Sequence, residues 1–94
     1  MDIQQRTFHL HMISDATGET LVTIARAVGV QYAAARAIEH LHPLVRSGRE
    51  LDRVLKEVEA APGIVLYTLF NRDMAEELEL ACKRLNVPYV APLL

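Results

Sequence analysis

The segment Ile13-Ser14-Asp15-Ala16-Thr17-Gly18-Glu19-Thr20 decides how this chain is interpreted. An apolar run from Phe8 to Ile13 leads into it and predicts a strand, and Leu21 to Tyr32 after it predicts a helix. A tight polar turn between a strand and a helix presents unpaired backbone N–H groups and the positive end of the helix dipole. We expect Thr17 to cap this helix and the carboxylate of Glu19 to be favourable in its first turn.

The rest of the chain continues the alternation of strand and helix. Ser47 and Glu50 have the spacing of a capping box, and Ala61-Pro62-Gly63 predicts the end of the helix that follows. The predicted strands are 8–13, 37–41, 64–69 and 89–91, and the predicted helices are 21–32, one after Ser47 and one from Asn71 to Asn86. This order (βαβαβαβ) predicts an α/β fold, a Rossmann-like three-layer domain with a parallel four-stranded sheet.

Composition limits the class of protein. The 94 residues suffice for a single domain, 1–94, and 51% hydrophobic with 23% charged residues is ordinary for a globular protein. A net charge of -2 argues against nucleic acid or an anionic membrane as partner. The single cysteine, Cys82, excludes an internal disulfide, and we expect a buried, inert thiol in a cytoplasmic protein. The apolar end Pro92-Leu93-Leu94 suggests the front piece of a longer enzyme.

Ligands of parallel α/β sheets bind at the carboxyl ends of the strands. Residues 14–20, 42–47 and 68–71 would lie at that edge, where the turn is suited either to bind an anion or only to cap its helix. The chain has neither a Walker loop nor a Gly-x-Gly-x-x-Gly motif. Asp15 also resembles the nucleophile of phosphoryl-transfer enzymes, and Arg46 could hold a phosphate or simply lie on the surface. The candidate phosphate- or nucleotide-binding residues are Ser14, Asp15, Thr17, Gly18, Glu19, Thr20, Arg46 and Ser47.

Histidines form a second group with potential chemistry. Each of two predicted strands places two imidazoles on one face, namely His9 and His11 on the first and His40 and His42 on the second. If these strands are neighbours, the four side chains could bind zinc. The alternative is a set of partly buried histidines that are hydrogen-bonded to the backbone.

Two blocks of the sequence resemble the pyruvate, phosphate dikinase / phosphoenolpyruvate synthetase regulatory protein family. The first joins Phe8-His9-Leu10-His11 to the turn Ser14–Thr20, and the second is Val45-Arg46-Ser47 with Leu51-Asp52-Arg53-Val54-Leu55. The strand Val65-Leu66-Tyr67-Thr68-Leu69 falls where that family has a similar segment. The resemblance covers nearly the whole chain and matches the N-terminal portion of the family.

The resemblance implies part of a bifunctional serine/threonine-protein kinase and phosphorylase. Such proteins use ADP to phosphorylate a threonine of pyruvate, phosphate dikinase or phosphoenolpyruvate synthetase, and they reverse this with inorganic phosphate, releasing pyrophosphate. Their P-loop lies in a C-terminal part that this sequence does not include, so no cofactor is expected in this portion and the isolated chain should not perform the full reaction. A non-catalytic docking module for the partner enzyme, a zinc-binding domain and a possible homodimer remain alternatives.

Overall fold

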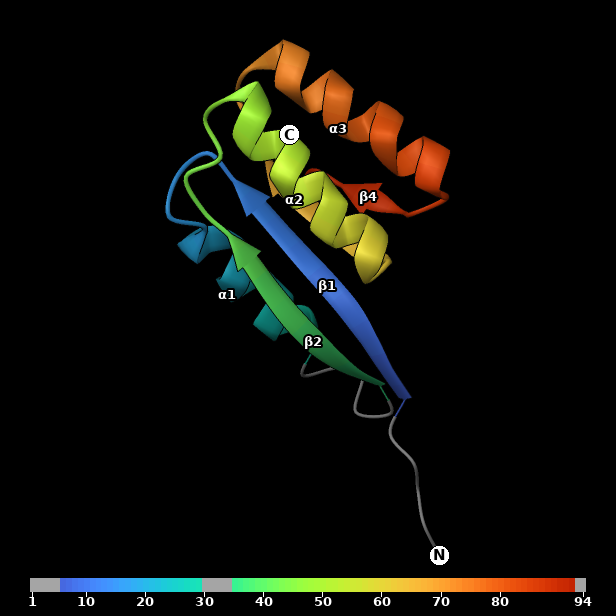
Figure 1. Cartoon of the computed structure of the whole chain (residues 1–94). Helices are drawn as coiled ribbons and strands as arrows, with labels where there is room; N and C mark the ends of the chain where they lie inside the picture. The colour runs from blue at the N-terminus through green and yellow to red at the C-terminus, as the bar shows by residue number, and fades with distance from the viewer. Residues whose placement is uncertain (1–5, 30–34, 93–94) are drawn as a thin grey trace, which may run out of the picture.

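The computed structural model describes residues 6–29 and 35–92, and it confirms the predicted alternation (Figure 1). The sheet has four parallel strands in the order β2-β1-β3-β4. The elements are β1 (Arg6–Ser14), α1 (Glu19–Gly29), β2 (Ala35–His42), α2 (Gly48–Ala60), β3 (Gly63–Thr68), α3 (Arg72–Leu85) and β4 (Tyr89–Val90).

The central strand β1 sets the register on both of its sides. Ile13 lies opposite His42 of β2 and opposite Tyr67 of β3, so the three strands reach the carboxyl edge together. The chain moves from β1 outward to β2 and then crosses back to β3, and a direction change of this kind opens a crevice at the carboxyl edge. The topology therefore places the predicted turn beside the loop that follows β3.

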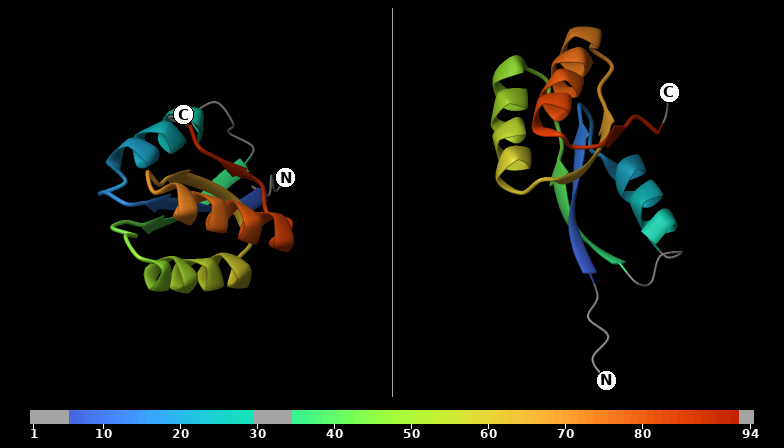
Figure 2. Two further views of the ribbon diagram at one scale, coloured as in Figure 1. Left: turned by 90° about the horizontal axis from the view of Figure 1, so that it is seen from above. Right: turned by 90° about the vertical axis from the view of Figure 1, so that its right-hand side faces the viewer.

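The helices cover the two faces of the sheet unequally, as Figure 2 shows. Helix α1 lies on one face, where the side chains of Leu10, Met12 and Leu21 form a small buried cluster. Helices α2 and α3 lie on the other face and bury a larger cluster that includes Ile13 and Val65. The arrangement is the predicted helix–sheet–helix sandwich.

The predicted N-cap residue is confirmed for α2 and α3 and is wrong for α1. Ser47 caps α2 through its side chain, which accepts from the N–H of Glu50 as the capping box predicts, but the Glu50 carboxylate accepts from the N–H of Arg46 and not from that of Ser47. Asn71 caps α3 in the same way. The expectation for Thr17 is wrong: α1 begins at Glu19, and the carbonyl of Gly18 accepts the first helical bond, from Val22 N at 3.0 Å. Gly18 is therefore the N-cap residue.

Other boundaries differ by a few residues. Strands β1 and β2 are longer than the predicted 8–13 and 37–41, whereas β4 ends one residue before Ala91. The predicted end of the first helix at Tyr32 lies outside the described residues. Within the described ranges, no helix has the length and apolar character needed to cross a membrane.

Candidate functional site at the carboxyl edge

The turn after β1 is bonded to the end of β3. The N–H of Asp15 donates to the carbonyl of Thr68 at 3.2 Å, and the Thr68 hydroxyl donates to Ser14 Oγ, also at 3.2 Å. Ser14 is only 2% exposed, and its Oγ accepts a second bond, from the N–H of Ala16 at 3.0 Å. These bonds fix the backbone of the turn against the carboxyl end of the sheet.

The carboxylate of Asp15 reaches the loop between β3 and α3. Its Oδ2 accepts from the backbone N–H of Phe70 at 2.9 Å. Sequence reasoning treated Asp15 as a ligand-binding residue or a nucleophile. In the structure the side chain is engaged in joining two loops of the edge.

The loop between β2 and α2 closes over the same turn. Leu44 N donates to the carbonyl of Ala16 and Val45 N to that of Ser14, each at 2.9 Å. Arg46 Nε donates to the carbonyl of Asp15 at 2.8 Å. The structure therefore brings Arg46 to the predicted turn, where its guanidinium holds the backbone. Its exposed position leaves room for the two remaining nitrogens to meet a ligand.

Ser47 is part of a local cap. Its hydroxyl donates to Glu50 Oε1 at 3.0 Å and accepts from Glu50 N at 3.2 Å, while Arg46 N donates to the same carboxylate oxygen at 3.2 Å. These bonds fix the start of α2 directly after the arginine. In this structure Ser47 stabilises the segment that carries Arg46.

The start of α1 presents a row of available donors. In the described part of the chain, the five backbone N–H groups from Thr17 to Leu21 donate to no protein acceptor. The turn reaches this arrangement through Gly18, whose φ of +82° is favourable for glycine and strained for other residues. The exposed side chains of Thr17, Glu19 and Thr20 surround these donors. An arrangement of this type is suited to bind a phosphate or carboxylate.

Sequence reasoning missed two apolar residues at this edge. Phe70 is 84% exposed in the β3–α3 loop, and Leu44 is 48% exposed in the β2–α2 loop. Leu44 also has a φ of +58°, which is unusual for a branched side chain. No hydrophobic periodicity marks single loop residues, so the pattern contained no signal for either.

The four histidines gather on the α2 side of the sheet. Nδ1 of His9 lies 2.8 Å from Nε2 of His40, and Nδ1 of His11 lies 3.0 Å from Nε2 of His42. The rings of His11 and His40 stack with centroids 4.5 Å apart, and those of His11 and His42 with centroids 5.3 Å apart. We call this set the histidine ladder. Its ring nitrogens bond to one another, and no group of three or more ligating side chains among the described residues could hold a metal ion.

Burial is the main cause that lowers the pKa of His11 and of His42 below the ordinary value of 6.5. For His11 the hydrogen bond to the carbonyl of Ala61 partly offsets this effect on the pKa. For His42 the neighbouring His11 lowers the pKa further and the carboxylate of Glu57 raises it. The two rings are therefore mainly neutral in the folded protein at neutral pH.

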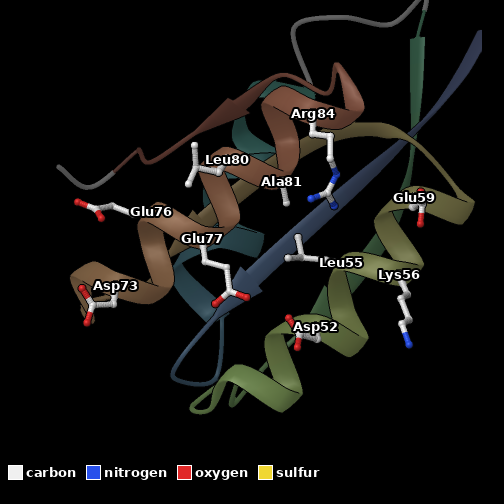
Figure 3. Close-up of a pocket in the computed structure, with 10 residues that line it drawn as sticks. All are labelled: Asp52, Leu55, Lys56, Glu59, Asp73, Glu76, Glu77, Leu80, Ala81 and Arg84. Carbon is white, nitrogen blue, oxygen red and sulfur yellow. The ribbon is translucent and has the colours of Figure 1, made fainter.

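A shallow groove of about 650 Å³ lies between α2 and α3, and none of the residues that line it belongs to the turn or to the two loops bonded to the turn (Figure 3). Asp52 and Glu77 approach each other across it, and burial with the hydrogen bond to Asp52 raises the pKa of Glu77. Cys82 of α3 is buried in the larger core cluster, and burial raises the pKa of its thiol to about 11. Neither feature includes a residue of the turn at the carboxyl edge.

Comparison with known proteins gives a consistent family. The model of the kinase/pyrophosphorylase family matches residues 10–93. A protein of Afipia carboxidovorans, named as a candidate pyruvate, phosphate dikinase regulatory protein, is 60% identical over 81 residues, 86% of this chain and 29% of the relative. One of Bradyrhizobium diazoefficiens with the same name is 57% identical over 88 residues, 94% of this chain and 32% of the relative. The chain thus spans about 30% of the length of these curated relatives.

Proposed function

The chain belongs to the kinase/pyrophosphorylase family, and on this premise we propose that it forms the N-terminal α/β domain of a bifunctional regulatory protein. The whole protein would act in the cytoplasm on pyruvate, phosphate dikinase or phosphoenolpyruvate synthetase. With ADP as donor it would phosphorylate a threonine of that enzyme, and with inorganic phosphate it would remove the phosphoryl group as pyrophosphate. A P-loop outside this sequence would bind the nucleotide, while the carboxyl edge of this domain binds a phosphate-bearing ligand.

The row of five N–H groups from Thr17 to Leu21 is the observation that carries this proposal. It combines with the dipole of α1, a helix of 11 residues, at the position where the sheet topology opens its crevice. A phosphate oxygen accepts several such bonds at once, because the donors follow one another along a single turn.

The charges of the edge are mixed, and this limits how tightly an anion is held. Arg46 supplies a guanidinium beside the turn, whereas Glu19 places a carboxylate in the first turn of α1. The carboxylate of Asp15 is partly offset by the N–H of Phe70. We therefore expect weak binding by the isolated domain, with a second set of phosphate contacts coming from the P-loop part.

A docking role for the same edge is the second candidate, and the exposed apolar residues favour it. Phe70 and Leu44 come from loops that are both bonded to the turn, and Phe70 borders a hollow of about 310 Å³ that Arg72 also lines. Exposed aromatic side chains with a nearby arginine are typical of protein interfaces. In that case the partner enzyme, and not a small ligand, would contact the edge.

Titration of the protein with phosphate, pyrophosphate and ADP separates these candidates. Ligand binding predicts saturable amide shifts in the nuclear magnetic resonance (NMR) spectrum, centred on Thr17 to Leu21. Arg46→Ala should weaken this binding by roughly 10- to 150-fold, because a charged hydrogen bond contributes roughly 1.5–3 kcal/mol. Arg49→Ala removes the same charge from an exposed position in α2 and serves as the matched control.

Two outcomes would contradict the ligand proposal. The first is the absence of saturable shifts at millimolar ligand, and the second is an equal effect of the two arginine substitutions. Either result leaves the docking candidate, for which Phe70→Ser should weaken association with the partner enzyme without changing the amide spectrum of the turn.

A further inference from the structure

We propose that the histidine ladder is a pH-sensitive latch: its neutral rings hold edge strand β2 and the end of α2 against β1, and doubly protonated ring pairs release them. Each hydrogen bond between ladder rings joins β1 to β2, since His9 and His11 belong to β1 and His40 and His42 to β2. The role is separate from phosphate binding at the carboxyl edge.

The proton positions on His11 follow from its hydrogen bonds. Nε2 of His11 lies 2.8 Å from the carbonyl oxygen of Ala61, an acceptor only, so this nitrogen carries a proton. The Nδ1 of neutral His11 is then an acceptor, and it accepts from the Nε2–H of His42 at 3.0 Å. One bond thus ties β1 to β2, and the other ties β1 to the residue after α2.

This pair tolerates one additional proton but not two. The first proton is accommodated on Nδ1 of His42, which lies 3.5 Å from Glu57 Oε2. A second proton has only Nδ1 of His11 left, where it would point at the Nε2–H of His42. Two donors facing each other at this distance repel, so the pair must separate.

The pair of His9 and His40 likewise tolerates one additional proton but not two. The bond between Nδ1 of His9 and Nε2 of His40 needs one proton, and each ring has one further nitrogen. A fourth proton on the pair breaks the bond. Because His40 of this pair stacks on His11 of the other, with ring centroids 4.5 Å apart, each charge on one pair also opposes a charge on the other.

Few of the surrounding charged groups stabilise the positive charge of the protonated histidines. Helix α2 places Arg53 and Lys56 as well as Glu57 around the hollow that His40 and His42 line. The Arg53 guanidinium opposes the charge of His42, and Glu57 alone of these three favours it. The Glu39 carboxylate of β2 lies 3.8 Å from Arg26 of α1, on the opposite face of the sheet.

Opening of the latch would affect β2 first, because β2 is an edge strand whose strand neighbour is β1. His42 is its last residue, and the N–H groups of Leu44 and Val45 follow with their bonds to the turn. Separation of the His11–His42 pair therefore loosens the carboxyl end of β2 and the start of the β2–α2 loop.

The direction of the pH effect follows from the two shifted groups. Folding lowers the pKa of His11 and His42 below 6.5, so the folded state binds these protons less readily than the unfolded state. The stability contributed by the neutral rings is fully present above this value and is lost as the pH falls toward and through the folded pKa values. The latch is thus closed at neutral pH and opens in mild acid.

Amide hydrogen exchange of the protein between pH 7.5 and 5, corrected for the intrinsic rate, tests the latch. Protection of β2 amides should fall about tenfold per pH unit for each proton taken up on opening. Amides of β3, which contains no histidine, provide the internal reference. Equal changes in β2 and β3 would overturn the proposal without any variant.

A pair of glutamine variants makes the test specific. In His42→Gln the amide group can donate to neutral His11 or accept from its protonated Nδ1, so the acid-induced loss at the end of β2 should disappear. His40→Gln makes the same change in the other pair and should retain that loss. An unchanged pH dependence in His42→Gln, or its disappearance in His40→Gln alone, would refute the assignment of the His11–His42 pair.

Discussion

Substitution of Gly18 by alanine tests whether the turn depends on its backbone conformation. Gly18 has a φ of +82°, and an L-residue in the left-handed region costs about 1–2 kcal/mol. A Cβ there would lie 2.6 Å from Cδ1 of Leu41, but that methyl belongs to a side chain that is 43% exposed and can rotate. Rotation adds at most about 1 kcal/mol. We expect a total loss of about 1–3 kcal/mol in the free energy of unfolding.

Urea unfolding followed by circular dichroism measures this loss, and two variants separate its causes. Leu41→Ala removes the methyl that the new Cβ would contact, so Gly18→Ala should lose about 1–2 kcal/mol in that background. Gly48→Ala is the control, because a Cβ at this first residue of α2 meets no heavy atom within 4 Å. It should leave stability unchanged or raise it by up to about 1 kcal/mol.

The reasoning would be refuted if Gly18→Ala and Gly48→Ala had equal effects on the free energy of unfolding. A cost that vanished entirely with Leu41→Ala would instead show that the steric contact, and not φ, requires glycine. In either case the row of donors at the start of α1 would no longer depend on Gly18.

Two further predictions concern the core. Gly63→Ala should cost about 3 kcal/mol or more in the same unfolding assay, because its Cβ would lie 2.0 Å from the backbone oxygen of His9. No side-chain rotation can relieve this clash. A cost no larger than that of Gly48→Ala would contradict the prediction. Cys82 should resist a thiol reagent at pH 8 until urea unfolds the protein, since burial raises its pKa to about 11; full-rate modification of the native protein would show that the thiol is accessible.

Much of the fold could be predicted because strong local signals agreed with one topology. The apolar run 64–69 indicated a strand, and β3 lies between β1 and β4 in the sheet. The spacing of Ser47 and Glu50 located the start of α2 because the bonds between them join residues only three positions apart. The prediction at Thr17 failed because Thr and Gly both cap helices, and only the left-handed φ of Gly18 decides between them.

The site was predictable as a region but not as a set of contacts. Sequence placed Arg46 at the carboxyl edge, yet its bond to the carbonyl of Asp15 joins residues 31 positions apart. The alternation of side chains between the two faces of a strand likewise placed two histidines on one face of β1 and two on one face of β2. Whether four imidazoles surround a metal or bond to one another depends on ring orientation, which the alternation of side chains along a strand does not determine. The exposed Phe70 and the positive φ of Leu44 depend on loop geometry that no periodicity records.

The central strand β1 explains why two special features occur in so small a domain. Among the described residues, His11 and Ser14 are the buried polar side chains, and both lie on β1, where an apolar residue would otherwise extend the core. Each costs stability unless its hydrogen bonds are satisfied. His11 meets this requirement with His42 and Ala61, and Ser14 with Ala16 and Thr68. Polar groups on one strand thus bind β2 and α2 at the ladder and β3 at the carboxyl edge, so the latch and the site share the same rigid support.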